Sequence, residues 1–190
     1  MKAHQRRSIL GWIIVMLAAS TAACRLNLGG PELPAAPEIS DAAATQVSTR
    51  WRDALGQAVT TGQVTVILTE EELTSALAAR LASDDDALFT SPAVMLRDGV
   101  IQVFGVVQTG PFEASMRFVV TPFIDGEGRL GFELSSADFG PLPAPEAIRE
   151  TITGMLSEAL AGPMGSRATG FRVTSVAVAD GALAIVAEMR

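Results

Sequence analysis

The stretch Ala93-Val94-Met95-Leu96-Arg97-Asp98-Gly99-Val100-Ile101-Gln102-Val103 decides the fold class of this chain. Asp-Gly between two apolar runs is typical of a two-residue β-hairpin, so we expect strands over 93–97 and 100–108. Residues 112–121 then alternate between apolar and mostly polar types, which predicts a strand with one buried face. The apolar members of that strand are Phe112, Ala114, Met116, Phe118 and Val120.

Further strands and three helices are predicted around this core. Turn residues at 125–128 precede a strand over 130–135, and Asp180-Gly181 joins two final strands over 171–179 and 182–189. A short strand is expected over 63–68. Helices are expected over 41–60, over 70–82, and from Pro145 to Leu160. This order predicts an α+β fold, with a mainly antiparallel sheet of about six to seven strands packed on two to three helices.

The first two helices carry recognisable local signals. Val47, Trp51, Leu55 and Val59 recur at a spacing of four, which predicts the buried stripe of the first helix. Ser40 or Asp41 is expected to cap its start. Thr69 and Glu72 have the spacing of a capping box at the start of the second helix. The acids Glu70, Glu71 and Glu72 also suit the positive end of a helix dipole.

The N-terminus has the pattern of a bacterial lipoprotein signal. A basic start with Lys2, Arg6 and Arg7 precedes an apolar run over 9–19, and small residues lead into Cys24, the only cysteine. Bacterial lipoproteins with this pattern are acylated on the cysteine and cleaved before it. We therefore expect a signal peptide over 1–23, lipidated Cys24, and an extracytoplasmic protein held on a membrane by acyl chains such as palmitate.

Other interpretations of this segment remain open. The run over 9–19 is short for a transmembrane anchor, which needs about 20 apolar residues. Cleavage after Ala23 without acylation would leave Cys24 as a free thiol, and a buried helix is a third possibility. Three prolines and two glycines over 25–39 predict a flexible tether. The expected organisation is therefore 1–23 signal, 24–39 lipidated cysteine and tether, and 40–190 a single domain.

Composition excludes most catalytic chemistry. After residue 23 the chain has no His, Lys or Tyr. It has 11 arginines and 21 acidic residues, which gives a net charge of −10. Catalytic triads, Schiff-base lysines and imidazole or thiolate metal sites are therefore excluded, and nucleic acid is a poor partner for so acidic a body. We expect a protein that is not an enzyme and that needs no cofactor and no metal.

The acidic clusters have simpler structural interpretations. Residues 84–86 could hold calcium, but they lack the spaced acids of a calcium loop, so a solvated loop is expected. Helix capping accounts for residues 70–72 without catalysis. A carboxylate-only enzyme acting on cell-wall sugars remains a third hypothesis, which requires two acids about 5–10 Å apart in a cleft.

Several motifs together resemble a known family. Thr69-Glu70-Glu71-Glu72-Leu73 follows a short strand, and a hairpin crosses Asp98-Gly99. Residues 136–143 lead into the third predicted helix, and residues 178–183 close the domain. Over about residues 63–189 the chain resembles the YpmS-like and LmeA-like bacterial envelope proteins and, distantly, the tubular lipid-binding (TULIP-like) fold. The resemblance implies a strongly curved half-barrel sheet cradling a helix, with an apolar groove for lipid tails.

The function expected is binding of a lipid or other apolar ligand in that groove. The alternative is a structural or adaptor lipoprotein that contacts another envelope protein through an exposed apolar patch. An ordinary closed core is equally compatible with the apolar pattern. The candidate groove residues are Phe104, Phe112, Met116, Phe118, Phe132, Ile152, Met155 and Phe171.

Overall fold

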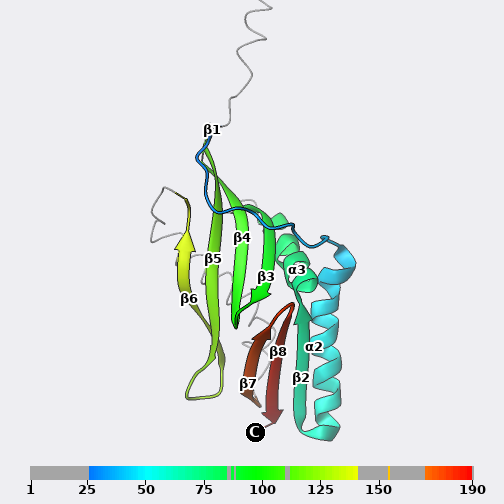
Figure 1. Cartoon of the computed structure of the whole chain (residues 1–190). Coiled ribbons are helices and arrows are strands. Elements are labelled where there is room, and N and C mark those ends of the chain that lie inside the picture. Colours follow the sequence, from blue (N-terminus) through cyan, green and yellow to red (C-terminus); the bar gives the residue numbers. More distant parts are fainter. Residues whose placement is uncertain are drawn as a thin grey trace, which may run out of the picture.

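The computed structural model describes residues 26–84, 87, 89–109, 112–140, 154 and 170–189 (Figure 1). Within these residues two helices pack against antiparallel strands, so the predicted α+β class is confirmed. The predicted helix over 145–160 lies outside the described residues.

A meander of four strands forms most of the large sheet. These strands are β3 (Thr90–Arg97), β4 (Val100–Thr109), β5 (Phe112–Ile124) and β6 (Leu130–Asp138), paired in antiparallel fashion in chain order. The predicted Asp98-Gly99 hairpin is confirmed, since Arg97 pairs with Val100 and both turn residues have positive φ. Register shifts at 90–93 and at Val119–Val120 interrupt the ladders, and such bulges bend a sheet.

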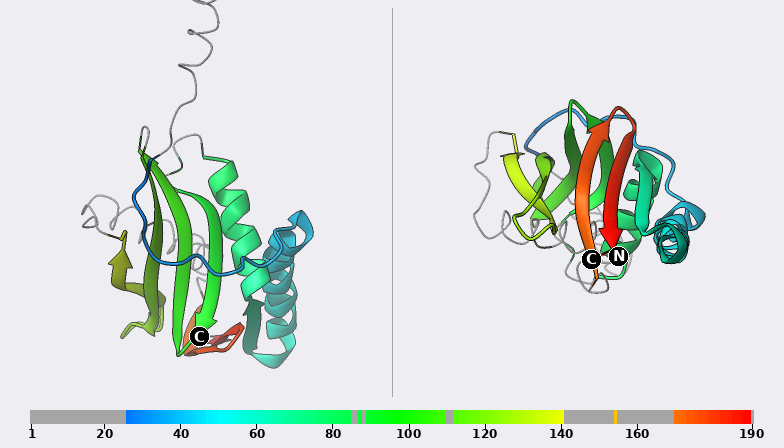
Figure 2. Two further views of the ribbon diagram at one scale, coloured as in Figure 1. Left: turned by 45° about the horizontal axis from the view of Figure 1, so that its top comes forward. Right: turned by 90° about the horizontal axis from the view of Figure 1, so that it is seen from below.

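The second edge of β5 is shared by two segments. β6 pairs with β5 from Arg117 onward, and the short strand β1 (Leu26–Asn27) pairs in parallel with its first residues, Phe112 and Glu113. The stretch predicted as a tether is therefore fastened to the sheet where it begins. The following residues cross in front of β4 and β3 to reach the first helix (Figure 1, Figure 2).

The remaining strands form a small sheet in the order β2-β8-β7. β2 (Gln63–Thr69) pairs with β8 (Ala182–Met189), which pairs with β7 (Phe171–Ala179). The six to seven strands predicted as one sheet divide between two antiparallel sheets. Hydrophobic alternation marks each strand, but it does not show that residues 63–69 pair with the end of the chain. The Gly181 N–H donates to the Leu96 carbonyl at 3.0 Å and links the two sheets.

The helices are α2 (Asp41–Thr61) and α3 (Glu70–Ala82), with the predicted caps at Ser40 and Thr69. α2 packs on α3 and β2, and α3 packs along β3. Val59 was predicted to face the core and is 78% exposed. A spacing of four exceeds the 3.6 residues of one turn, so each step drifts by about 40° around the helix. The buried positions shift to Ala54 and Ala58 instead.

Candidate apolar ligand site

One face of the large sheet is a continuous apolar surface. On β5, Met116, Phe118 and Val120 are fully buried, and their neighbours across the ladder on β4 are Gly105, Val103 and Ile101. We call this surface the core face. It belongs to one hydrophobic cluster with Leu73, Leu77 and Leu81 of α3, Trp51 of α2, and Leu183 and Ile185 of β8.

Aromatic rings fill the core face around β5. The rings of Phe118 and Phe139 meet edge to face, with centroids 5.3 Å apart. Gly105 leaves room for Phe89, because a Cβ at Gly105 would lie 2.5 Å from the Phe89 ring and 3.0 Å from Met116 Cε. The missing side chain at residue 105 thus lets an aromatic ring lie directly on β4.

The predicted groove residues divide between two faces of the large sheet. Met116, Phe118 and Phe132 are buried and belong to the core cluster, and Phe171 on β7 is half-buried against it. Phe104 has the opposite parity on β4 and points to the outer face, where it is 7% exposed. Phe112 stands at the start of β5 and is 43% exposed. Cys24, Ile152 and Met155 lie outside the described residues.

A proline-rich segment crosses the outer face of the large sheet (Figure 2). Residues 30–40, which we call the strap, cross the large sheet from β5 to α2 (Figure 2). Every third strap residue is half-buried and the two between are exposed, which is the period of a polyproline II helix. The half-buried residues are Pro31, Pro34, Pro37 and Ser40. This proline spacing was visible in the sequence, but its composition was interpreted only as flexibility.

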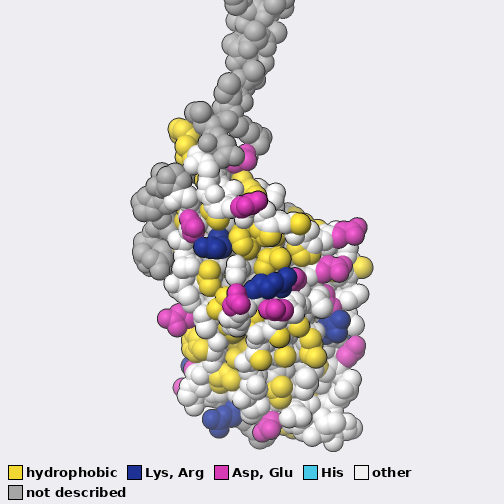
Figure 3. Space-filling model, in the orientation of Figure 1, with side chains coloured by type: hydrophobic (Ala, Val, Ile, Leu, Met, Phe, Trp, Pro, Cys, Tyr) yellow, Lys and Arg dark blue, Asp and Glu magenta, His cyan; other side chains and the backbone are white. Residues whose placement is uncertain are grey.

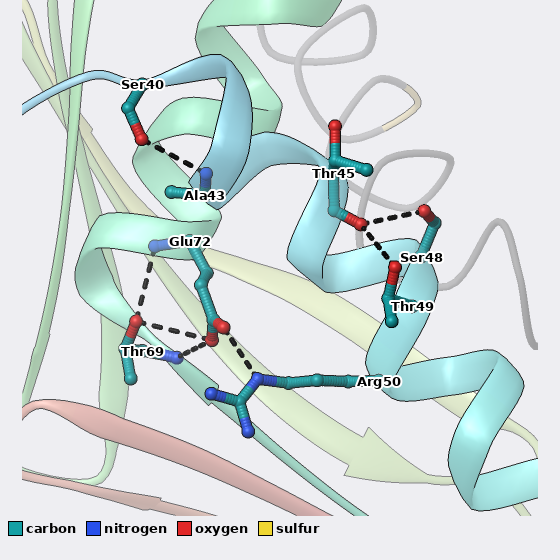
Figure 4. A network of polar contacts seen from close by, with 8 residues as sticks. All are labelled: Ser40, Ala43, Thr45, Ser48, Thr49, Arg50, Thr69 and Glu72. Carbon is teal, nitrogen blue, oxygen red and sulfur yellow. Dashed lines mark hydrogen bonds and ion pairs between the residues drawn. The ribbon is translucent and has the colours of Figure 1, made fainter.

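Among the described residues, the buried polar side chains of Glu72, Thr74 and Ser75 each accept a hydrogen bond that holds a helix in place. Glu72 accepts the Thr69 backbone N–H at 2.9 Å, and its other carboxylate oxygen accepts the Nε–H of Arg50 at 2.6 Å (Figure 4). The Ser75 hydroxyl accepts the backbone N–H of Ser40 at 3.1 Å, which fastens the end of the strap. The predicted capping box is confirmed, and its Glu72 has a second role in joining α3 to α2.

Side chains of α3 also satisfy the free edge of β3. The Thr74 hydroxyl accepts the Val94 N–H at 2.9 Å, and Glu70 accepts the Leu96 N–H at 2.7 Å while pairing with the guanidinium of Arg97. Edge strands with unpaired N–H groups invite pairing with other chains, and this helix prevents it. Glu70 and Glu72 therefore have structural partners, whereas catalytic acids need access to a substrate.

The acidic turn between β5 and β6 is a local structure at the surface. The backbone N–H of Arg129 donates to Asp125 at 2.8 Å and its Nε–H donates at 2.7 Å, and these bonds lower the pKa of the Asp125 carboxyl. Among the described residues no cluster of acids, His or Cys has the arrangement of a metal site. Asp85 and Asp86 lie outside them. The helices that the structure describes include none with the length and apolar character of a membrane span.

The chain matches one known protein family over most of its length. The sequence model of a family described as LmeA-like phospholipid-binding matches residues 25–188, which covers both sheets, both helices and the strap. No curated protein matches the chain.

Proposed function

The chain belongs to the LmeA-like phospholipid-binding family, and on that premise we propose that it is a lipid-anchored envelope protein that holds phospholipid acyl chains against its core face. The protein acts by binding and not by catalysis. The observation that carries the proposal is the family match over 25–188, which spans every element that contributes to the apolar cluster.

The chemistry of the core face suits acyl chains. Ile101, Val103, Met116 and Phe118 offer only apolar surface, and Met adapts its shape to irregular ligands. These side chains are buried by other parts of the domain, so an acyl chain has to replace existing contacts. Burial of a methylene group contributes about 0.8 kcal/mol, and a long chain can therefore offset the contacts that it displaces.

The lack of His and Lys after residue 23 supports binding over catalysis. Beyond residue 23 the chain has neither His nor Lys, and the buried acid Glu72 is committed to Thr69 and Arg50. The anchor rests on the signal pattern that ends at Cys24. Acylation there would hold the domain outside the cytoplasmic membrane, with the membrane and a lipid ligand as its partners.

A photoactivatable phospholipid tests the binding site directly. Residues 25–190, which lack the acylated cysteine, are incubated with vesicles that contain a phosphatidylethanolamine carrying a diazirine in one acyl chain. Native mass spectrometry then shows whether lipid leaves the vesicle with the protein. Irradiation followed by peptide mapping locates the chain, and we expect adducts on the core-face residues of β4 and β5.

The outer face of β5 provides the matched control. Val119 is next to Phe118 in sequence but points to the opposite face, so it should remain unlabelled. A protein recovered at its bare polypeptide mass would contradict lipid binding. Equal labelling of Phe118 and Val119 would contradict the core face as the site.

One observation favours the alternative of an adaptor lipoprotein. The exposed face of the small sheet carries no charged side chain in three of its four rows, which run from Thr65, Ile67 and Thr69 across β8 to β7. Ile67 is among the exposed large apolar residues, and uncharged atoms prevail over β2, β7 and β8 (Figure 3). Ile67→Glu should then abolish recovery of an envelope protein in cross-linked extracts, while Gln63→Glu, at the rim of the same strand, should not.

A further inference from the structure

The chain is fastened to the domain almost directly after Cys24. Leu26 pairs with Phe112, the Leu28 N–H donates to the Glu113 carbonyl at 2.8 Å, and the Ser115 N–H donates to the Gly29 carbonyl at 3.1 Å. The strap then continues over the outer face to Ser40. The segment expected to give the domain a long reach is therefore bound to the domain itself.

We propose that the tip of the large sheet formed by β1 and the start of β5 rests on the bilayer that holds Cys24. This inference depends on the lipid anchor proposed above. Only Arg25 stands between Cys24 and Leu26, and two residue steps span about 7 Å when fully extended. An acylated Cys24 thus holds this tip at the lipid headgroups.

The composition of the tip fits a lipid interface. Phe112, the partner of Leu26, is 43% exposed although it continues the inward alternation of β5. A phenylalanine ring at this position can enter the boundary between headgroups and acyl chains, where Trp, Phe and Leu side chains anchor interfacial segments. The tip therefore offers the bilayer an apolar contact beside the covalent anchor.

The net charge of the domain and the length of β5 determine its orientation on the bilayer. Beyond the signal the chain carries 11 arginines against 21 acids, so an anionic bilayer repels the body within about 8 Å, the Debye length at physiological salt. The 13 residues of β5 span about 40 Å along the strand. We infer an upright domain, with the small sheet and the C-terminal end of α2 at the distal end (Figure 1).

β5 offers a matched pair of positions for the test. Phe112 and Phe123 are 43% and 44% exposed and stand near opposite ends of the strand. In the full acylated protein the thiol of Cys24 is blocked, so Phe112→Cys and Phe123→Cys each carry one free thiol for an environment-sensitive fluorophore. Gln108→Cys, an exposed position across the ladder from Glu113, is a second tip probe in case Phe112→Cys does not fold.

The experiment measures quenching by phospholipids that carry a nitroxide at the headgroup, in phosphatidylcholine vesicles with one-third phosphatidylglycerol. Intact-mass measurement on the same sample verifies the acyl groups on Cys24. We expect quenching at residues 112 and 108 to be several-fold greater than at residue 123, with a blue-shifted emission at residue 112 only.

The other outcomes overturn the proposal in distinguishable ways. Equal quenching at residues 112 and 123 would mean that the domain lies flat. Absence of quenching at both ends of an acylated sample would mean that residues 26–40 have left the sheet and act as a tether, which would leave the anchor itself intact. A sample without acyl mass would refute the anchor and the orientation together, without bearing on lipid binding by the core face.

Discussion

Arg50 on α2 donates its Nε–H to the Oε1 atom of Glu72 on α3 at 2.6 Å, and the Glu72 side chain is 3% exposed. The other carboxylate oxygen is held by the backbone of Thr69, so one buried acid caps its own helix and binds the neighbouring one. A buried carboxylate that loses its cationic partner keeps the cost of desolvation without the compensating attraction. Removal of Arg50 is therefore a sensitive test of whether this ion pair holds α2 against α3.

Arg50→Ala should lower the free energy of unfolding by about 2 kcal/mol, because it leaves the Glu72 charge buried with fewer donors. Arg52→Ala, on an exposed position of the same helix, should change it by less than about 0.5 kcal/mol. Urea unfolding of residues 25–190 measures both. Glu72→Gln in the Arg50→Ala background removes the buried charge and should recover part of the loss. Equal effects of the two arginine substitutions would refute the pairing.

Thr74→Val should destabilise the domain by about 1–3 kcal/mol. Valine has nearly the shape of threonine, so the loss reports mainly the Val94 N–H, which loses its acceptor in the interior. Thr45→Val is the control, since the Thr45 hydroxyl donates to the Asp41 carbonyl at an exposed position. Hydrogen exchange of the Val94 amide should accelerate in the first variant only. Unchanged exchange would show that α3 does not protect the edge of β3.

The Asp125 carboxyl should titrate below its ordinary pKa of 3.8, because the Arg129 backbone N–H and guanidinium hydrogen-bond its charged form. A lowered folded-state pKa contributes stability that is complete above the unfolded-state pKa and is lost as the pH falls through the folded-state value. Carboxyl-detected NMR titration measures the midpoint. Arg129→Ala should move it upward, toward 3.8. A midpoint at or above 3.8 in the unsubstituted protein would contradict this account.

The sequence was most informative where structure is determined locally. The Asp98-Gly99 turn and the Thr69–Glu72 capping box depend on a few adjacent residues, and both were placed correctly. The alternation over β5 also identified Met116 and Phe118 as inward-facing. Parity along β4 places Phe104 on the other face, and that assignment required knowledge of the register between the two strands.

Features that depend on distant pairing were not predictable in the same way. The small sheet forms because β2 meets β8 across more than 100 residues, and hydrophobic pattern contains no such information. The Arg50–Glu72 pair likewise depends on the packing of two helices. The strap is an intermediate case. Its prolines recur every third residue, so a polyproline II conformation could have been predicted. The face of the sheet that the strap covers became apparent only from the fold.

Gly140→Ala and Gly56→Ala should change stability in opposite directions, and together they test whether the start of the chain is fastened to β5. Gly140 has φ of +69°, and a Cβ there would lie 2.7 Å from the Gly30 Cα, so alanine strains its own backbone and presses on the strap. We expect a loss of at least about 1 kcal/mol, since the left-handed conformation alone costs that much for a residue with a Cβ.

Exchange of the Ser115 amide, which donates to the Gly29 carbonyl, should also become faster in Gly140→Ala. Gly56 lies within α2 with no atom near its Cβ position, so alanine should stabilise the domain by about 0.5–1 kcal/mol and leave Ser115 unchanged. Unaltered Ser115 exchange in Gly140→Ala would mean that the strap does not depend on this close approach. In that case the short connection between Cys24 and the large sheet, on which the upright orientation rests, would lose its structural support.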